Sequence, residues 1–146
     1  METTDCRIHN WVLVPTGGEI KIPCYPKRVL GITKFGEFDF TEPSYPENHI
    51  VPAKHCAGIR LTEKLLLKLG FKKKHPGLPN VYVLVIDVHS QTGIELQEIE
   101  NGFQFFVEDE CGINTIDVVF EDLHQLQNLY LDLNHKELII DPTVIT

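Results

Sequence analysis

The chain has 146 residues, 42% of them hydrophobic and 23% charged, and its formal net charge is −8 at pH 7. This length predicts one domain over residues 1–146, and the composition is typical of a globular protein and excludes a disordered or collagen-like chain. The negative charge disfavours non-specific binding to nucleic acid or to anionic membranes, because both surfaces would repel the molecule.

The sequence contains neither a membrane-spanning pattern nor a secretory signal. No apolar run approaches the roughly 18 residues that a transmembrane helix needs, so we expect no membrane contact. The N-terminus METTDCRIHNW has no basic region followed by an apolar segment, which predicts a cytoplasmic protein. Cys6, Cys24, Cys56 and Cys111 show no CxxC spacing, so we expect thiols and reject a disulfide framework.

Residues 7–41 predict a cluster of short antiparallel strands. In its last strand, Phe38 and Phe40 alternate with polar residues, which is typical of a half-buried strand. Proline and glycine separate the strands from one another, and a small SH3-like curled sheet is the natural packing for them. The predicted strands are Asn10–Val14, Ile20–Ile22, Arg28–Thr33 and Glu37–Thr41.

A proline-rich loop over residues 42–59 follows, with one possible short strand at His49–Val51. The region from residue 60 to residue 146 then begins with a short helix. Thr62 is its predicted N-cap and Gly70 its left-handed stop, and Phe71 stands where a Schellman contact to Leu66 is expected.

An antiparallel sheet is predicted next. Val81–Val88 is a continuous apolar strand, and Ile94–Val107 is a hairpin around Asn101-Gly102, a strong type I′ turn signal. Ile113–Phe120 is the last long strand. We expect one buried face on the hairpin, formed by Ile94, Leu96, Phe105 and Val107.

The clearest helix lies within Asp122–Leu138. Its apolar residues recur at steps of three and four, so Leu123, Leu126, Tyr130 and Leu133 share one face. Asp122 is the predicted N-cap, and Asn134 or His135 ends the helix, Asn being the better left-handed residue. Leu138–Ile140 is predicted to be a short strand. The sum is an α+β fold: the strand cluster, then an antiparallel sheet packed with two helices.

Three stretches resemble a set of short uncharacterised proteins from Bacteroidetes and their phages. Arg7–Val12 is similar to "RIGNWV", Ile59–Phe71 to "PLTEEWLLKFGF", and Leu123–Leu138 to "VHQLQNLYFALTGEEL", in the same order and at similar separations. The chain departs from the set at Leu65, where Trp is frequent, and at Asn134-His135. The resemblance implies a prophage or mobile-element origin and carries over no activity.

The sequence offers three kinds of candidate catalytic or metal site, and each has an ordinary explanation. A zinc site could use His49, His55, Cys56 and His75, but the spacings match no zinc module. A thiolate could form at Cys56 beside His55, or at Cys24, but no nucleophile signature accompanies either.

Acidic residues form the third kind of candidate site. Carboxylates at Glu108-Asp109-Glu110 and Glu121-Asp122 could serve a small metal-dependent hydrolase, although charged turns are the simpler interpretation. We therefore predict no catalytic residue, no cofactor and no metal.

Nucleic-acid binding is the alternative function. Aromatic residues in the strand cluster could stack bases, and the lysine run Lys72–Lys74 could bind phosphates, although the net charge opposes this. The aromatics are Trp11, Tyr25, Phe35 and Tyr45.

The first-ranked function is a non-enzymatic interaction or structural module that acts through protein contacts and could form a homodimer. Its partner is not identified by the sequence. The predicted interaction residues are polar or basic and lie after the first helix and on the second: Lys72, Lys73, Lys74, His124, Gln125 and Asn128.

Overall fold

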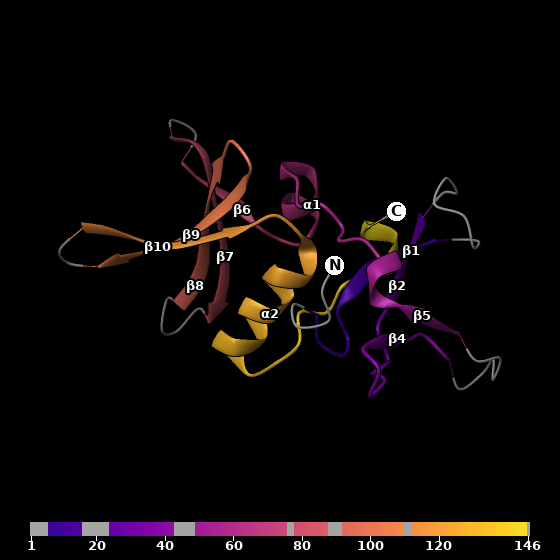
Figure 1. Cartoon of the computed structure of the whole chain (residues 1–146). Helices are drawn as coiled ribbons and strands as arrows, with labels where there is room; N and C mark the ends of the chain where they lie inside the picture. The colour runs from indigo at the N-terminus through magenta and orange to yellow at the C-terminus, as the bar shows by residue number, and fades with distance from the viewer. Residues whose placement is uncertain are drawn as a thin grey trace. The chain divides into compact units, whose positions relative to one another are not determined.

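The computed structural model describes residues 6–15, 24–42, 49–75, 78–87, 92–109 and 112–145. Small antiparallel sheets and two α-helices make up the described chain, which confirms the predicted α+β class (Figure 1). The chain forms two compact units. Unit 1 comprises Met1–Arg60 and Asp122–Thr146, and unit 2 comprises Leu61–Glu121.

Unit 1 is built on two small antiparallel sheets. In the first, β1 (Trp11–Pro15) pairs with β2 (Cys24–Arg28), so that Trp11 lies opposite Arg28. In the second, the order is β3 (Gly31–Ile32), β4 (Glu37–Asp39) and β5 (Ile50–Pro52). The short strand predicted at His49–Val51 is thus confirmed as β5, and the 3-10 turn η2 (Ala53–His55) follows it. The SH3-like arrangement stays a prediction.

The strand predicted over Arg28–Thr33 is wrong as one element, because the chain changes partners within it. The Val29 N–H donates to the Asn10 carbonyl at 2.8 Å, whereas the next N–H, of Leu30, donates to the Asp39 carbonyl at 2.8 Å. Val29 is therefore hydrogen-bonded to the segment leading into the first sheet, and Leu30 is hydrogen-bonded to the second sheet. Apolar pattern alone cannot reveal such a switch, since both segments are hydrophobic.

A hydrophobic core joins the two sheets of unit 1. Phe38 and Phe40 are both buried, and their rings meet edge to face with centroids 6.3 Å apart, an arrangement that aromatic quadrupoles favour. The remaining core residues come from β1 and from the segments next to the strands: Cys6, Val12, Val14, Val29, Ala53 and Cys56. Two of the four cysteines thus serve as small apolar core residues.

The second helix, α2 (Leu123–Asn134), belongs to unit 1. Its N-cap is Asp122 as predicted, and the Asp122 N–H donates to Gln125 Oε1 at 3.0 Å, as in a capping box. The helix ends at Asn134, and His135 takes the left-handed position with φ 53°. Of the predicted apolar face, Leu123 and Leu126 are fully buried, whereas Leu133 is 48% exposed.

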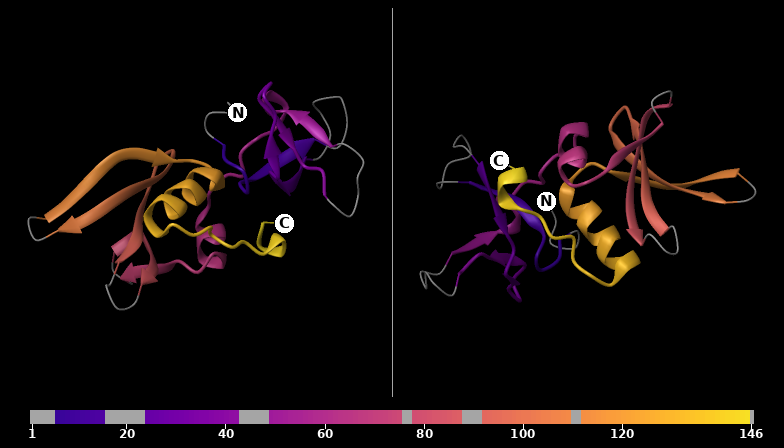
Figure 2. Two further views of the ribbon diagram at one scale, coloured as in Figure 1. Left: turned by 90° about the horizontal axis from the view of Figure 1, so that it is seen from below. Right: turned by 180° about the vertical axis from the view of Figure 1, so that it is seen from behind.

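Unit 2 is a meander of five antiparallel strands in the order β10-β9-β8-β7-β6 (Figures 1 and 2). Its register aligns Tyr82, Leu96 and Phe105, and all three are buried. Ile94 is also fully buried, which agrees with the buried hairpin face that the alternation predicts. The strands are β6 (Lys72–His75), β7 (Leu78–Asp87), β8 (Thr92–Ile99), β9 (Gly102–Asp109) and β10 (Gly112–Phe120).

The first helix, α1 (Glu63–Lys68), has the predicted ends. The Leu65 N–H donates to the Thr62 hydroxyl oxygen at 3.2 Å. Gly70 adopts φ 96°, and the Phe71 N–H donates to the Leu66 carbonyl at 3.0 Å. This pair of features is the Schellman motif that the sequence predicts.

The hairpin turn lies one residue earlier than predicted. Ile99 pairs with Gly102, so Glu100 and Asn101 form the two-residue turn and Gly102 begins β9. A Cβ on Gly102 would lie 2.6 Å from the Phe120 carbonyl oxygen. Glycine is therefore needed because β10 passes close to the backbone at this position.

Two further local predictions need correction. Leu138–Ile140 forms no strand in the described structure, and Ile139 is 93% exposed while Ile140 is buried. A short turn, η3 (Pro142–Val144), follows. The lysines Lys72–Lys74, for which the sequence predicts no strand, pair with β7 as part of strand β6. The predicted strand at Ile20–Ile22 lies outside the described residues.

Candidate functional site

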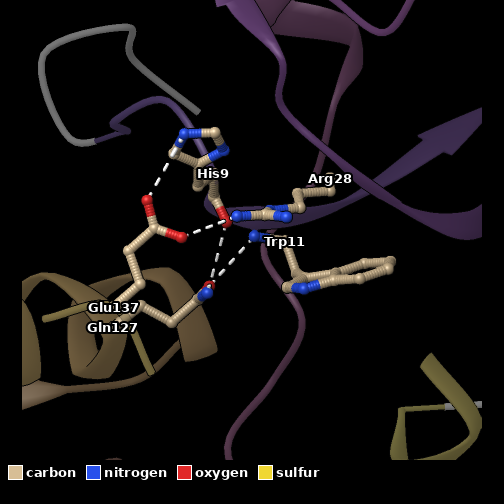
Figure 3. Close-up of polar contacts among 5 residues, drawn as sticks. All are labelled: His9, Trp11, Arg28, Gln127 and Glu137. Carbon is tan, nitrogen blue, oxygen red and sulfur yellow. Dashed lines mark hydrogen bonds and ion pairs between the residues drawn. The ribbon is translucent and has the colours of Figure 1, made fainter. Parts of the chain in front are cut away.

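The side chain of Gln127 connects α2 to the first strand of unit 1 (Figure 3). Its Oε1 accepts a hydrogen bond from the Trp11 N–H at 2.9 Å, and its Nε2 donates to the His9 carbonyl at 3.4 Å. Gln127 is only 7% exposed. Both polar ends of its buried amide form hydrogen bonds with backbone groups, as buried polar groups generally do. The backbone at Trp11 is thereby fixed on the helix.

A carboxylate beyond the end of α2 holds a second strand residue (Figure 3). Glu137 accepts from Arg28 Nη2 at 2.6 Å and lies 3.3 Å from His9 Nε2. A further ion pair joins Arg7 to Asp132 through two contacts of 2.7 and 3.1 Å. The Arg7 guanidinium lowers the pKa of the Asp132 carboxyl below its ordinary value. Of these contacts, the one from Glu137 orients Arg28 beside Trp11, its partner across the β1–β2 ladder.

A groove of about 430 Å³ opens beside these residues. Its surface is mostly apolar, and it carries two cationic side chains and one carboxylate. We call it the Trp11 groove, lined by Trp11, Pro26, Lys27, Arg28, Leu30, Phe40, Glu42 and Pro142. Aromatic, proline and aliphatic walls with a few charged groups are typical of sites that bind extended peptide segments.

The charges of the Trp11 groove are not equivalent. Arg28 is already paired with Glu137, whereas the Lys27 Nζ lies 3.4 Å from His49 Nδ1. The same Nζ lies 5.8 Å from the centre of the Tyr25 ring. Among the described residues, no carboxylate pairs with Lys27. Lys27 is therefore the cation of the groove that can take an anionic partner group.

The predicted interaction lysines lie on β6 of unit 2. Lys73 Nζ contacts Glu63 Oε1 at 2.6 Å, and Lys74 Nζ contacts Glu95 Oε2 at 2.9 Å. Lys72 is exposed. Two of the three lysines thus make internal ion pairs, and the run as a whole borders the sheet.

The predicted interaction residues of α2 belong to unit 1, not to the unit of the lysines. His124 is buried at 3% exposure, and Asn128 is half-buried. Gln125 uses its side-chain oxygen to cap the helix. The described structure therefore gives each of these three residues a place in the packing of the helix.

The candidate zinc ligands are divided between the two units. His49 packs on Phe40 with ring centroids 5.7 Å apart, and His55 is exposed on η2. Cys56 is buried, with its Sγ 4.0 Å from the Pro52 carbonyl, whereas His75 lies in unit 2. Over the described ranges, no group of three or more His, Cys, Asp or Glu side chains could hold a metal ion.

The remaining candidates are aromatic residues, acidic residues and cysteines. Phe35 is 78% exposed at the turn between β3 and β4, with Lys34 Nζ 5.0 Å from its ring centre, whereas Trp11 lines the groove. Glu121 ends unit 2 and Asp122 caps α2. The side chains of Cys24, Glu108 and Asp109, and the whole of Tyr45, Glu110 and Cys111, lie outside the described residues.

Sequence reasoning missed the residues that build and support the Trp11 groove. Lys27, Arg28 and Glu137 look like ordinary surface charges in the sequence, and Gln127 falls on the face of the helix that periodicity assigns to solvent. Pro142 lies more than a hundred residues after Trp11. The one local signal was Trp11, a large aromatic residue at the start of a strand.

Comparison of the chain with protein-family models, with curated proteins and with solved structures gave no match. Within the described part of the chain, no helix has the length and apolarity needed to cross a bilayer.

Proposed function

We propose that the protein is a non-enzymatic interaction module that docks an extended segment of a partner protein in the Trp11 groove. The observation that supports this most is the mostly apolar groove of about 430 Å³ beside an aromatic residue whose backbone is fixed by Gln127. Rigid aromatic anchors of this kind dominate the binding energy of many protein interfaces.

The chemistry of the groove defines the partner segment. Trp11, Pro26 and Pro142 offer flat apolar contacts that suit a proline or aliphatic side chain. Lys27 adds a cation with no carboxylate partner among the described residues. We therefore propose a segment in which an apolar residue is followed closely by Asp or Glu.

The groove is organised before a partner binds. The Glu137–Arg28 contact of 2.6 Å restrains one wall, and the Gln127–Trp11 contact of 2.9 Å restrains another. Restraint of this kind reduces the entropy lost on binding, which would otherwise weaken the complex.

We further propose that the protein acts in the cytoplasm and that it derives from a prophage or mobile element. The resemblance of three segments to proteins of Bacteroidetes and their phages supports the second of these proposals.

Selection from a random peptide display library tests this function. The wild-type chain is the bait, and Lys27→Glu is used for counter-selection, since it reverses the charge of the groove at one side chain. Lys34→Glu is the matched control, because Lys34 is an exposed lysine of the same unit that does not line the groove. Enriched peptides with an apolar-acidic consensus that bind Lys34→Glu but not Lys27→Glu are expected. Failure to enrich any peptide sensitive to Lys27→Glu would contradict the proposal.

Nucleic-acid binding is a second candidate that one observation favours. All five lysines of unit 2 fall between Lys64 and Lys74, while its acidic residues lie mostly after Asp87. A local basic surface can bind phosphates despite a negative total charge. Fluorescence anisotropy with a labelled single-stranded oligonucleotide tests this candidate. Binding must appear at low salt and weaken steeply as salt is added, and no binding at low salt excludes it.

A further inference from the structure

The outer edge of β2 borders the Trp11 groove. Among the described strands, only β1 pairs with β2. The Val29 N–H donates to the Asn10 carbonyl at 2.8 Å, so it faces the segment that leads into β1. Backbone polar groups alternate between the two sides of a strand in an antiparallel sheet. Those of Arg28 and Pro26 therefore point away from β1, and both residues line the groove.

The strand that could cover this edge turns away before it reaches β2. The strand β4 pairs with β3 as far as Asp39, which lies opposite Gly31. The Thr41 N–H then donates to Asp39 Oδ1 at 2.8 Å, so the chain turns at the point where continued pairing would bring it beside β2. Phe40 and Glu42 line the groove together with residues of β2. The groove therefore lies where a further strand could pair with the β2 edge.

Side chains on β2 alternate between the two faces of the sheet. Trp11 lies opposite Arg28 in the register, and Pro26 is two residues from Arg28, so these three residues share one face. Lys27 lies between Pro26 and Arg28 in the chain and is on the other face. A strand added at this edge would therefore direct every second side chain to the Trp11 face, and the intervening side chains to the Lys27 face.

We propose that the partner segment binds as a third strand on the β2 edge, with the sequence pattern apolar, Asp or Glu, apolar. This inference rests on the proposed docking function and specifies its geometry. Main-chain hydrogen bonds to the Arg28 N–H and to the carbonyls of Arg28 and Pro26 hold the segment. Its acidic residue lies across from Lys27, and the apolar residues on either side of the acid pack towards Trp11 and Pro26.

The composition of β2 favours this occupant over a second copy of the chain. The sequence of β2, Cys-Tyr-Pro-Lys-Arg, contains two cations and no acid. Pairing of β2 between two copies would bring Lys27 and Arg28 of both into one short ladder, and like charges opposite one another are unfavourable. Each copy would also contribute a proline, which has no N–H to donate. A partner strand with a central acid avoids both disadvantages.

A peptide display library tests the proposal from the side of the ligand. The probe is a library of eight-residue peptides in which Asp is fixed at the fourth position and all other positions are random. The wild-type chain is the bait, and Lys27→Glu is used for counter-selection. The most enriched peptide is then synthesised in several versions, each N-methylated at one backbone amide, so that one donor is removed at a time. Calorimetry measures the Kd of each version.

We expect apolar residues directly before and after the fixed Asp. N-methylation should weaken binding about tenfold or more at every second amide around the Asp and change it by less than about twofold at the intervening amides, because only alternate amides of a strand face its neighbour. Peptides that are sensitive to Lys27→Glu but show no such alternation would overturn the strand pairing and leave the docking function standing. A library with no peptide sensitive to Lys27→Glu would contradict both.

The variant Arg28→Pro tests the edge from the side of the protein. Proline removes the N–H that points away from β1, so the ladder between β1 and β2 is kept. Arg28→Ala is the matched control, because it removes the same side chain and its contact with Glu137 but keeps the N–H. The selected peptide should bind Arg28→Pro about tenfold more weakly than Arg28→Ala. Equal affinities would overturn the strand pairing.

Two further measurements complete the test. Circular dichroism melting shows whether Arg28→Pro and Arg28→Ala are folded, and the N-methylated peptides decide the question on the wild-type chain if Arg28→Pro is not. Sedimentation velocity without peptide tests the other occupant, a second copy, and we expect no association through β2. A wild-type chain that forms dimers, together with an Arg28→Pro variant that stays monomeric and an Arg28→Ala variant that dimerises, would overturn the choice of a partner segment.

Discussion

Gln127 on α2 accepts a hydrogen bond from the backbone N–H of Trp11, across 116 positions of the sequence, at 2.9 Å. Its amide nitrogen donates to the His9 carbonyl, so one buried side chain holds two points of the strand segment that leads into β1. This contact links the longest helix to the wall of the groove. Packing and proposed function therefore depend on the same residue.

Gln127→Ala is expected to lower the free energy of unfolding by about 1–3 kcal/mol, because it leaves the part-buried Trp11 N–H without its acceptor. Gln127→Glu keeps an acceptor but buries a charge, and we expect it to destabilise the protein at least as much. Urea denaturation followed by circular dichroism measures both. The exposed Gln97→Ala serves as a control and should stay within about 0.5 kcal/mol of the wild type.

Glu137→Gln should affect binding more than stability. The Arg28 and Glu137 side chains are 42% and 43% exposed, and ion pairs between exposed groups contribute only about 0–1 kcal/mol. Loss of the contact nevertheless releases one wall of the groove. We expect a nearly unchanged unfolding midpoint together with weaker binding of a selected peptide. A variant that unfolds much more easily would show that the contact is chiefly structural.

Gly70→Ala should destabilise α1 through backbone strain rather than through a clash. Gly70 adopts φ 96°, which an L side chain rarely tolerates, yet an added Cβ would meet only Leu84 Cδ1 at 3.7 Å. The expected loss is about 1 kcal/mol in the free energy of unfolding.

Thr62→Ala at the other end of α1 should cost about 0.5–2 kcal/mol, whereas Thr62→Ser keeps the capping oxygen and should recover most of it.

Tyr82 makes stability fall at high pH. Burial, followed by the charges of Glu98 and Glu63, raises the pKa of the Tyr82 hydroxyl from 10.0 to about 12. The folded chain holds this proton more tightly than the unfolded chain does. Ionisation of Tyr82 should therefore leave the free energy of unfolding unchanged below pH 10. The free energy of unfolding should decrease as pH rises from 10 towards about 12.

Tyr82→Phe isolates this effect. Denaturation at a series of pH values should show that the variant loses less stability than the wild type between pH 10 and 12, because it has no phenol to ionise. Parallel pH profiles for the two proteins would contradict the assignment. The hydroxyl also donates to Glu98 Oε2 at 3.4 Å, so the variant removes one weak hydrogen bond at every pH.

The features that the sequence predicts well depend on residues close together in the chain. Thr62 caps the first turn of α1, Gly70 and Phe71 end the same helix, and the alternation of Phe38 and Phe40 over Glu37–Thr41 indicates the buried face. Long-range partners are different. Helical periodicity assigns Gln127 to the solvent side, because it cannot show that a strand segment more than a hundred residues earlier covers that side.

The same limit explains what was missed at the groove. Nothing near Lys27 or Arg28 in the sequence indicates that Trp11 and Pro142 line a surface with them. The change of sheet between Val29 and Leu30 depends on which strands lie on either side, and neighbouring residues do not encode it. Local chemistry therefore predicts the elements, whereas the site comes from their assembly.

The emission of Trp11, the only tryptophan of the chain, tests the proposed function most directly. A display-selected peptide with an apolar-acidic motif is titrated into the wild-type chain, Lys27→Glu and Lys34→Glu. We predict a saturable shift of the emission in the wild type and in Lys34→Glu, and no shift in Lys27→Glu. A peptide that binds all three proteins equally and leaves the emission of Trp11 unchanged would contradict the assignment of this groove as the docking site.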